Sequence, residues 1–500
     1  MTVRVAGLVL AGALAASPAA GQGYRLRVDA RLQTAAYRGV TLDSIPVIDT
    51  ITGPTGGPIS PDSFAVQCDA GAAYCRFWRP GPEQSATPFT ALADLVMWGL
   101  GLPGLSARGV GRFNADLAGG EAWPGTEPGF ELLEGYAEYA HERVTGRLGR
   151  QLVTSRFGVF GFDGAGATYR VPAQNIEVGG YAGWGLGQAA ALPVSSPVLN
   201  PLDEFRPRER LVIAGLSAGW RRDRFDARAE YQREVDPEIK KLTSERAALA
   251  ATVRPLTGLT VALASDWDLA FGAWGSAEAT ATYARDRVTA SAGGRRYRPH
   301  LPLWTIWGAF SPVPYSAWWG SVAVTAAPRL TLRGRAETYQ FAPAEVSTAL
   351  VNAEDDGYRF ELGGTWSPRP GWTADAGYHR EFGPGAASAG WSGAVTYAPE
   401  HGRVAATLYG ASLVRPLEFR FNEAAVTSYG IDADLRASER TRIVVGAARY
   451  NQEQRRPDAA AFDWNQWRLS ARLVLLFGSG GELDRLPPAI RRLPGGRSTR

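Results

Sequence analysis

The scarcity of several residue types and patterns narrows what this chain can be. Its 500 residues include two cysteines, two methionines and four histidines, and the only lysines are Lys240 and Lys241. Beyond residue 21 no stretch reaches the roughly 18 to 20 uninterrupted apolar residues that a membrane-spanning helix needs, which excludes a helical membrane protein. The net charge of +4 is a small difference between 53 basic and 49 acidic residues, and it predicts no nucleic-acid partner.

Linkers, composition breaks and a helical 3.6-residue periodicity are also missing, so one large domain is the simplest interpretation. The two cysteines, Cys68 and Cys75, are close together in a loop-like segment, and in an exported protein they favour a local disulfide. A metal site is disfavoured because His141, His300, His379 and His401 are all remote from them. We expect no metal and no cofactor.

Residues 1–21 are typical of a secretory signal peptide. A short basic start, with Arg4, is followed by an apolar run from Val5 to Ala16 that is too short to span a bilayer. Small residues at Ala19 and Gly21 favour cleavage after Gly21, so the mature chain is expected to begin near residue 22. No cysteine lies at this junction, so a lipid anchor is not expected.

What the chain has in abundance is strict alternation of apolar and polar residues. In residues 24–36, Leu26 and Val28 alternate with Arg27 and Asp29, and the pattern recurs at 224–235 and 330–341. Such segments are longer than the five or six residues of a typical soluble strand and match the nine to eleven that cross a bilayer. The alternation therefore predicts membrane strands with one face toward lipid and one toward a polar lumen.

Connections between these segments alternate between short and long. Ten short connections carry Pro, Gly or charge, and eleven longer ones fall between them, including 39–88, 154–163 and 299–316. The count gives about 22 strands, with a range of 18 to 24, and an even number places both termini in the periplasm. The predicted fold is an all-β, up-and-down antiparallel transmembrane barrel over residues 22–477, without a plug domain. Trp and Tyr gather near the predicted strand ends, Trp318 and Trp319 among them, as membrane-interface residues do.

Charged side chains on the polar faces are the candidates for lining a pore. Arginines there could favour anionic solutes, but acidic neighbours such as Asp29 and Glu337 share those faces, so the selectivity stays open. The predicted pore-lining residues are Arg25, Arg27, Arg31, Arg108, Arg112, Arg150, Arg228, Glu230, Arg333 and Arg335.

The last predicted strand carries an apolar face that includes Trp467 and Leu475 and ends at Phe477. It resembles the C-terminal signal by which outer-membrane assembly machinery recognises Gram-negative β-barrels. That resemblance implies residence in the outer membrane, among its lipid and lipopolysaccharide, and assembly by that machinery. Residues 478–500 depart from the pattern as a basic, Pro-containing tail, for which a disordered periplasmic overhang is expected.

A second resemblance covers residues 130–170. Gly149-Arg150-Gln151 followed by the segment Phe157 to Gly164 resembles the part of porins in which a strand leads into a loop that folds inward and narrows the pore. The resemblance implies that Arg150 faces the lumen and that Phe160, Phe162 and Asp163 shape a constriction. The alternative is a plain turn, since Asp-Gly is a turn signal by itself.

Three functions compete at this stage. About 22 strands enclose a lumen too wide for side chains to fill, which favours a porin-like channel for passive diffusion of small hydrophilic solutes. The alternative is a sleeve for a separate partner protein in the lumen, as in an export or electron-transfer complex. A hydrolase built on His379, Glu381 and Asp375 is disfavoured because no strong nucleophile lies beside them, and no enzyme activity is expected.

Overall fold

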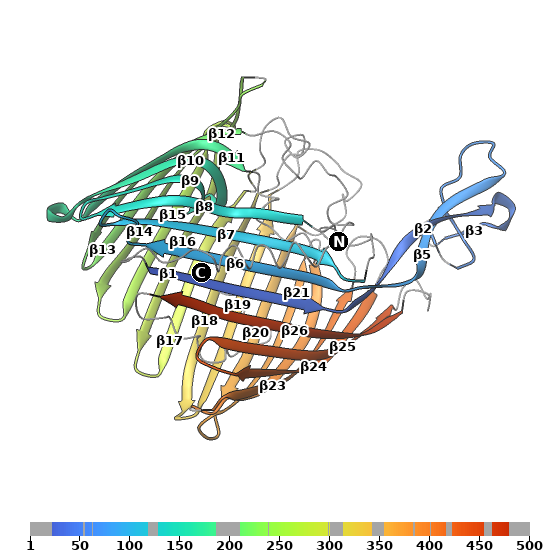
Figure 1. Cartoon of the computed structure of the whole chain (residues 1–500). Helices are drawn as coiled ribbons and strands as arrows, with labels where there is room; N and C mark the ends of the chain where they lie inside the picture. Colours follow the sequence, from blue (N-terminus) through green and yellow to red (C-terminus); the bar gives the residue numbers. More distant parts are fainter. Residues whose placement is uncertain are drawn as a thin grey trace.

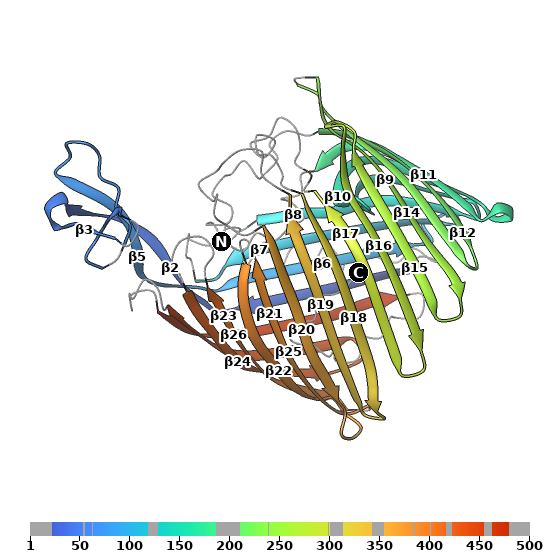
Figure 2. The ribbon, with the colours of Figure 1, turned by 180° about the vertical axis from the view of Figure 1, so that it is seen from behind.

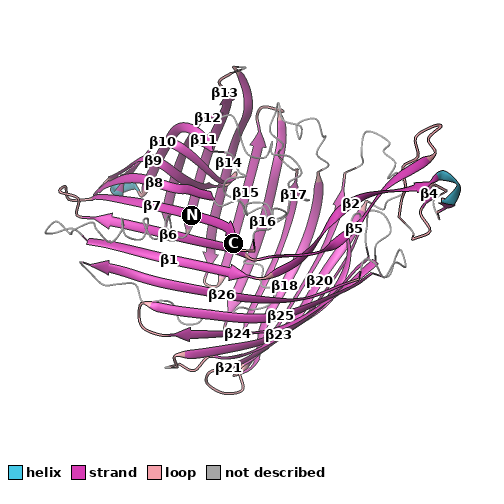
Figure 3. Cartoon of the chain, turned by 45° about the vertical axis from the view of Figure 1, so that its right-hand side comes forward, coloured by secondary structure: helices cyan, strands magenta, loops and turns pink. Residues whose placement is uncertain are grey.

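In the computed structural model of the chain, the described residues are 23–53, 56–62, 64–118, 129–186, 211–238, 240–298, 300, 314–342, 355–383, 386–400, 402–416, 423–454 and 463–479. The predicted signal peptide lies outside them, as does the predicted tail from residue 480. Among these residues, strands account for nearly all regular structure (Figure 3). No helix in this part of the chain is long and apolar enough to cross a membrane.

Twenty-two strands form one closed antiparallel barrel, because β1 pairs with both β6 and the last strand, β26 (Figure 1). The predicted fold class and strand number are confirmed. In chain order the barrel strands are β1 (Gly23–Gln33), β6 (Pro88–Trp98), β7 (Leu105–Asp116), β8 (Gly129–His141), β9 (Val144–Ser155), β10 (Gly158–Val171), β11 (Ile176–Leu186), β12 (Leu211–Arg222), β13 (Phe225–Asp236), β14 (Lys241–Leu256), β15 (Leu259–Asp268), β16 (Ala273–Arg285), β17 (Val288–Tyr297), β18 (Tyr315–Ala327), β19 (Leu330–Phe341), β20 (Asp356–Trp366), β21 (Trp372–Gly383), β22 (Ala386–Tyr397), β23 (Val404–Pro416), β24 (Glu423–Arg436), β25 (Thr441–Gln454) and β26 (Trp464–Ser479).

The ten short connections lie at one end of the barrel, where the sequence predicts them (Figure 2). At the opposite end the breaks between described strands range from two residues, between β9 and β10 and between β21 and β22, to the whole of residues 187–210 between β11 and β12. Short turns mark the periplasmic end of an outer-membrane barrel and long loops mark the extracellular end. The turn between β14 and β15 shows the local chemistry: Gly258 has a φ of +83°, and a Cβ there would collide with the carbonyl oxygen of Ala284. Turn chemistry of this kind is local, which is why the sequence predicts it well.

Two segments predicted as loops contain strands instead. The first, 39–88, contains β2 (Ala35–Pro46) and β5 (Tyr74–Ala86), which pair as a ribbon that projects beyond the barrel rim (Figure 1). The tip of this ribbon carries β3 (Ile51–Thr52), β4 (Pro58–Ile59) and the short 3-10 helix η1 (Val47–Asp49). We call residues 35–86 the arm.

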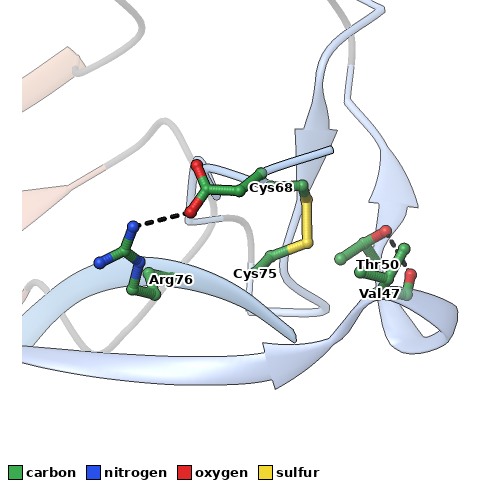
Figure 4. Close-up of a disulfide and its surroundings, with 6 residues drawn as sticks. Val47, Thr50, Cys68, Cys75 and Arg76 are labelled. Atoms are coloured by element: carbon green, nitrogen blue, oxygen red, sulfur yellow. Dashed lines mark hydrogen bonds and ion pairs between the residues drawn. A yellow bond between two sulfur atoms is a disulfide. The ribbon is translucent and has the colours of Figure 1, made fainter. Parts of the chain in front are cut away.

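The arm has a small core of its own. Phe64, Val66 and Phe77 are buried together with Cys75, and Cys75 is joined to Cys68 by a disulfide (Figure 4). Beside the disulfide, the guanidinium of Arg76 donates to the carboxylate of Asp69 at 2.8 Å. The disulfide closes a short ring within the tip of the arm. It therefore stiffens the arm and places no constraint on the barrel.

The second wrong loop is 154–163. Strands β9 and β10 continue through it, and only Arg156 and Phe157 connect them. The reason is continuous pairing across the predicted loop, with Phe160 opposite Val153 and Phe162 opposite Gln151. The Asp-Gly pair at 163–164 is therefore within strand β10 and makes no turn there. At the other end of this strand, the 3-10 helix η2 (Pro172–Gln174) forms part of the turn to β11.

The outer face of the barrel is apolar. Leu216, Leu332 and Trp318 are exposed on it, Trp318 at 72%. Exposed tryptophans of this face lie toward the strand ends, as interface residues do, at Trp184, Trp220, Trp267, Trp274, Trp318 and Trp366. Trp391 is exposed on the same face but lies in the middle of β22. Trp319 is an exception to the predicted set, because it points inward, opposite Glu337, where the guanidinium of Arg335 lies 4.7 Å from its ring centroid.

Candidate functional site: the barrel lumen

The inner face of the barrel is built from the polar half of each alternating strand. Adjacent residues of a strand point to opposite faces, so the apolar outer residues fix the inward direction of their neighbours. By this criterion nine of the ten predicted pore-lining residues face inward: Arg25, Arg27, Arg31, Arg108, Arg112, Arg228, Glu230, Arg333 and Arg335.

The tenth predicted residue, Arg150, faces away from the lumen, so its prediction as pore-lining is corrected. It shares its face of β9 with Leu148, which is 68% exposed, while its neighbour Gln151 points inward and is buried. Its guanidinium pairs with Asp163 of β10, with Nε to Oδ1 at 2.7 Å, so Asp163 also points away from the lumen. The physical reason is the period of two: with Gln151 and Phe162 directed inward, their neighbours Arg150 and Asp163 must face outward.

The β9–β10 hairpin nevertheless folds inward. Phe162 is fully buried, and its ring centroid lies 5.2 Å from that of Tyr181 on β11, while Phe160 packs at 5.4 Å from the same ring. Ile213 of β12 completes this apolar cluster. Inner faces of neighbouring strands thus pack against each other, which is possible only where the sheet curls sharply.

Glycines explain the sharp curl. Gly164 of β10 lies opposite Gly149 of β9 and Gly183 of β11, so three glycines form one row across the inner face. A Cβ at any of the three would collide with backbone, at Gly164 with the carbonyl oxygen of Ala182, and Gly149 has a φ of +128°. Only glycine allows the backbones this close, so the row marks where the hairpin leaves the cylinder. We call this row the glycine crease.

The tip of the hairpin reaches across two strands. The backbone N–H of Arg156 donates to the carboxylate of Glu230 on β13 at 2.7 Å. The guanidinium of Arg246 on β14 lies 4.6 Å from the ring centroid of Phe157 and donates to the carbonyl oxygen of Phe157 at 3.3 Å. A charged side chain over an aromatic ring is a favourable contact, and it is stronger where water is partly excluded. The tip therefore covers the inner wall between β10 and β14.

Two inner-wall carboxylates are each surrounded by three arginines. Glu337, whose side chain is 1% exposed, contacts Arg295 at 2.5 Å, Arg335 at 3.1 Å and Arg359 at 3.6 Å. These four residues come from β17, β19 and β20, so the cluster links β19 to its neighbour β20 and, across β18, to β17. A carboxylate buried among fixed guanidiniums forms charge-assisted hydrogen bonds that hold the strands of the barrel wall together.

The second such carboxylate lies at the barrel seam. Asp29 of β1 accepts from Arg472 of β26, with Nε to Oδ1 at 2.8 Å, and also contacts Arg31 at 3.2 Å and Arg27 at 3.5 Å. Because β1 and β26 are the first and last strands, this cluster joins the two ends of the described barrel.

Charge is unevenly distributed around the lumen. The wall of β13 to β16 is rich in inward carboxylates: Asp226, Glu230, Glu234, Asp236, Asp266, Asp268 and Glu278. Its inward basic residues include Arg228, Lys241 and Arg246. The wall of β26, β1, β6 and β7 is rich in inward arginines: Arg25, Arg27, Arg31, Arg108, Arg112, Arg468 and Arg472. Half the strand order separates β26 and β1 from β15 and β16, so these two walls face each other.

The outward side of the last strand carries the predicted assembly residues. Trp467 is exposed, and Leu475 and Phe477 pair in register with Val28 and Leu26 of β1. Strand β26 extends two residues past Phe477, to Ser479, so residues 478 and 479, which the sequence assigns to the tail, belong to the strand. Within the described residues no group of three or more His, Cys, Asp or Glu side chains is placed to hold a metal ion.

The three residues of the disfavoured hydrolase alternative share one inner face without forming a hydrogen-bonded set. His379, Glu381 and Asp375 alternate along β21. Asp375 accepts from the hydroxyl of Thr365 at 2.5 Å, and Glu381 contacts Arg359 at 3.7 Å. Their described contacts are thus with neighbouring strands of the wall.

A closed barrel with an apolar outer belt, tryptophans on that belt and a charged interior has the architecture of outer-membrane β-barrels. No protein family and no curated sequence matches the chain.

Solved structures resemble the chain at low identity. OccAB4 of Acinetobacter baumannii is 8% identical with a TM-score of 0.39, over 91% of this chain and 98% of that one. OccK5 (OpdH) of Pseudomonas aeruginosa is 10% identical with a TM-score of 0.40, over 91% and 98%. The FrpB iron transporter of Neisseria meningitidis is 9% identical with a TM-score of 0.47, over 93% and 83%.

Proposed function

We propose that the protein is an outer-membrane channel through which small hydrophilic solutes diffuse passively. The observation that carries the proposal is the closed 22-stranded barrel with a charged inner face. A barrel of this strand number encloses more space than its own side chains fill, and a polar interior admits water. The nine inward-facing predicted residues would then line an aqueous path.

The β9–β10 tip is proposed to form the constriction. It is anchored at Glu230 and Arg246, so it occupies lumen space in front of β11 to β13. Phe160 and Phe162 would pack the hairpin against Tyr181 and Ile213. They would therefore support the constriction without contacting the solute. Asp163 and Arg150 hold strands β9 and β10 together on the opposite face.

The facing walls of opposite charge would act on solutes at the same level of the channel. A solute that carries both charges can turn its cationic group toward β13 to β16 and its anionic group toward β26 and β1. Fixed charges on walls of low dielectric constant focus their electric field into the lumen. A net preference for anions or cations would then depend on small differences between the walls.

Export and assembly are part of the same proposal. Residues 1–21 would direct secretion and be removed, and the outward face of β26 with Trp467, Leu475 and Phe477 would be recognised by the assembly machinery. The apolar belt would then contact outer-membrane lipid and lipopolysaccharide.

Single-channel recording in planar lipid bilayers tests the channel. We expect stepwise conductance from the wild type, and a larger conductance from Phe157→Ala, because the variant loses the ring that Arg246 covers. Trp391→Ala, an exposed outer-face variant on β22, is the matched control and should conduct like the wild type. A wild type without conductance at any salt or voltage would refute the channel and favour a sleeve that encloses a partner protein.

A further inference from the structure

The sheet divides between β8 and β9. Pairing of these two strands runs from the short turn that joins them to Gly135 and Arg150, and it stops there. Beyond this point residues 129–134 of β8 pair with β7, and residues 151–155 of β9 pair with β10. Within the described part of the chain, neither segment has a partner strand on its other side. We call this division the fork.

A side chain bridges the fork. The guanidinium of Arg150 donates through Nη1 to the carbonyl oxygen of Leu132 on β8 at 2.8 Å. Through Nε and Nη2 it also donates to the carboxylate of Asp163 on β10, at 2.7 and 2.9 Å. In a membrane an unpaired strand edge is unfavourable, because lipid offers its backbone groups no partner. Arg150 therefore supplies one such partner to β8 while it holds β9 and β10 together as one unit.

The edge of β8 has a defined sidedness. A bulge leaves Leu133 without an opposite residue on β7, because Glu134 pairs with Val110 and Leu132 with Gly111. Glu134 therefore points inward, and Leu132 points outward, where it is 43% exposed. The same alternation directs Phe130 outward, and its exposure is 64%.

The edge of β9 matches that of β8 in length and sidedness. Gln151 and Val153 point inward, and Leu152 between them points outward. If the register continued past the fork, with Leu133 left over, the pairs would be Gln151 with Glu134, Leu152 with Leu132, Val153 with Glu131, Thr154 with Phe130 and Ser155 with Gly129. The two residues of each pair would then point to the same face. Both segments would also end together, since Ser155 is the last residue of β9 and Gly129 is the first of β8.

The contacts that hold the hairpin inward could be exchanged for this pairing. Glu230 accepts from the backbone of the tip, Arg246 covers its aromatic ring, and Phe160 and Phe162 pack against the inner face of β11 and β12. The glycine crease lies at the base of the hairpin, where the backbone can turn without a side chain in its way. One strand thus has two alternative sets of partners, which is the basis of a two-state element.

We infer that the β9–β10 hairpin is a gate with two positions. In its inward position it narrows the lumen. In the second position residues 151–155 pair with residues 129–134, which completes the wall at the fork and widens the path. The inference rests on the proposed channel function, and it assigns the regulation of that channel to the fork and the glycine crease.

A cysteine pair tests the second position directly. Leu132→Cys and Leu152→Cys would lie opposite each other once the wall is complete, at a Cα separation of roughly 4.5 to 5.5 Å, which a disulfide can bridge. The pair is introduced into the full-length chain with Cys68→Ser and Cys75→Ser, reconstituted in lipid vesicles and oxidised. We expect the 132–152 disulfide, located by mass spectrometry.

Ala137→Cys with Leu148→Cys is the matched control. These two residues are already opposite each other on the other side of the fork, so this pair should cross-link in either position of the hairpin. A control that cross-links beside a 132–152 pair that does not refutes the gate, whether or not the protein conducts ions.

Single-channel recording tests the effect on the path. The 132–152 disulfide should hold the channel at its larger conductance, and reduction should restore the smaller one, while the oxidised control conducts like the wild type. A 132–152 cross-linked channel with wild-type conductance overturns the inference and leaves the channel intact.

A second variant answers the same question if the cysteine pair prevents folding. Glu230→Ala removes the acceptor of the tip, so the fraction of time at the larger conductance should rise several-fold. Glu361→Ala, which removes an inward carboxylate from β20, away from the tip, is its control. Equal fractions in the two variants and the wild type would overturn the gate.

Discussion

At the scale of single residues, the inner wall depends on a few carboxylates that each hold several arginines. Glu337 is the clearest case, since Arg295, Arg335 and Arg359 all converge on its nearly inaccessible side chain. Removing one partner of a buried pair leaves the others uncompensated, and this costs more than the pair contributes in its intact form. The alternating pattern marks Glu337 and Arg335 as inward-facing on one strand, but Arg295 and Arg359 come from β17 and β20, which only the sheet register brings to Glu337.

Glu337→Gln should lower the free energy of unfolding by about 3 kcal/mol, because three guanidiniums lose their shared counter-charge. Urea titration of the protein in lipid vesicles, followed by tryptophan fluorescence, measures the loss. Glu361→Gln on β20 is the control, since Glu361 also faces inward and makes no ion pair within 4 Å among the described residues. Equal losses in the two variants would show that the arginine cluster does not depend on Glu337.

At the scale of elements, the glycine crease decides where the β9–β10 hairpin leaves the barrel wall. Gly149, Gly164 and Gly183 occur in the sequence at inward positions, and this is the signal that could have located the inward fold. Strand pairing places them side by side, which spacing along the chain does not reveal. The resemblance in this segment implies an inward loop, whereas the structure has paired strands there, and Arg150 faces away from the lumen. That the hairpin narrows the pore stays a prediction.

Gly164→Ala should open or unfold the hairpin, because the added methyl group collides with the Ala182 carbonyl. We expect a higher conductance or a lower yield of folded, heat-modifiable protein. Gly219→Ala on the inner face of β12 is the control, where the nearest atoms lie 3.9 Å from the new Cβ. Wild-type conductance and yield for Gly164→Ala would show that the crease tolerates a side chain.

The arm is the second element whose behaviour can be separated from the barrel. Cys68→Ser with Cys75→Ser removes a short-ring disulfide, which is expected to lower the stability of the tip by about 2 to 3 kcal/mol. Limited proteolysis of the variant should cut within the arm, while the gel-mobility shift on boiling, which reports the barrel, stays at the wild-type temperature. A lowered temperature for that shift would show that the arm supports the barrel.

At the scale of the whole molecule, closure of the sheet sets the two charged walls against each other. Neutralising Glu278 on β16 as Gln should move ion selectivity toward anions, and Arg27→Gln on β1 should move it toward cations. Each change in the permeability ratio should be about twofold, since a unit charge about 8 Å from an ion in water contributes roughly 0.5 kcal/mol. Reversal potentials across a potassium chloride gradient measure both, and shifts of the same sign would contradict the opposed walls.

The sequence by itself determined the fold class, the number of strands and the positions of the short turns. These features are local: a period of two within one strand and the Gly, Pro or charge of one turn are complete in ten or fifteen residues. The outward side of β26 and the inward side of β1 were predictable for the same reason.

Only the tertiary structure decided which inward residues meet. The contacts of Arg156 with Glu230, of His300 with Ser244, and of Asp29 with Arg472 join residues 56 to 443 positions apart. They depend on strand register, on the curl at three glycines and on closure of β1 against β26, none of which is encoded within a single segment. The alternation within each strand determines which residues face inward. Closure of the sheet determines which inward residues of different strands lie close together around the lumen.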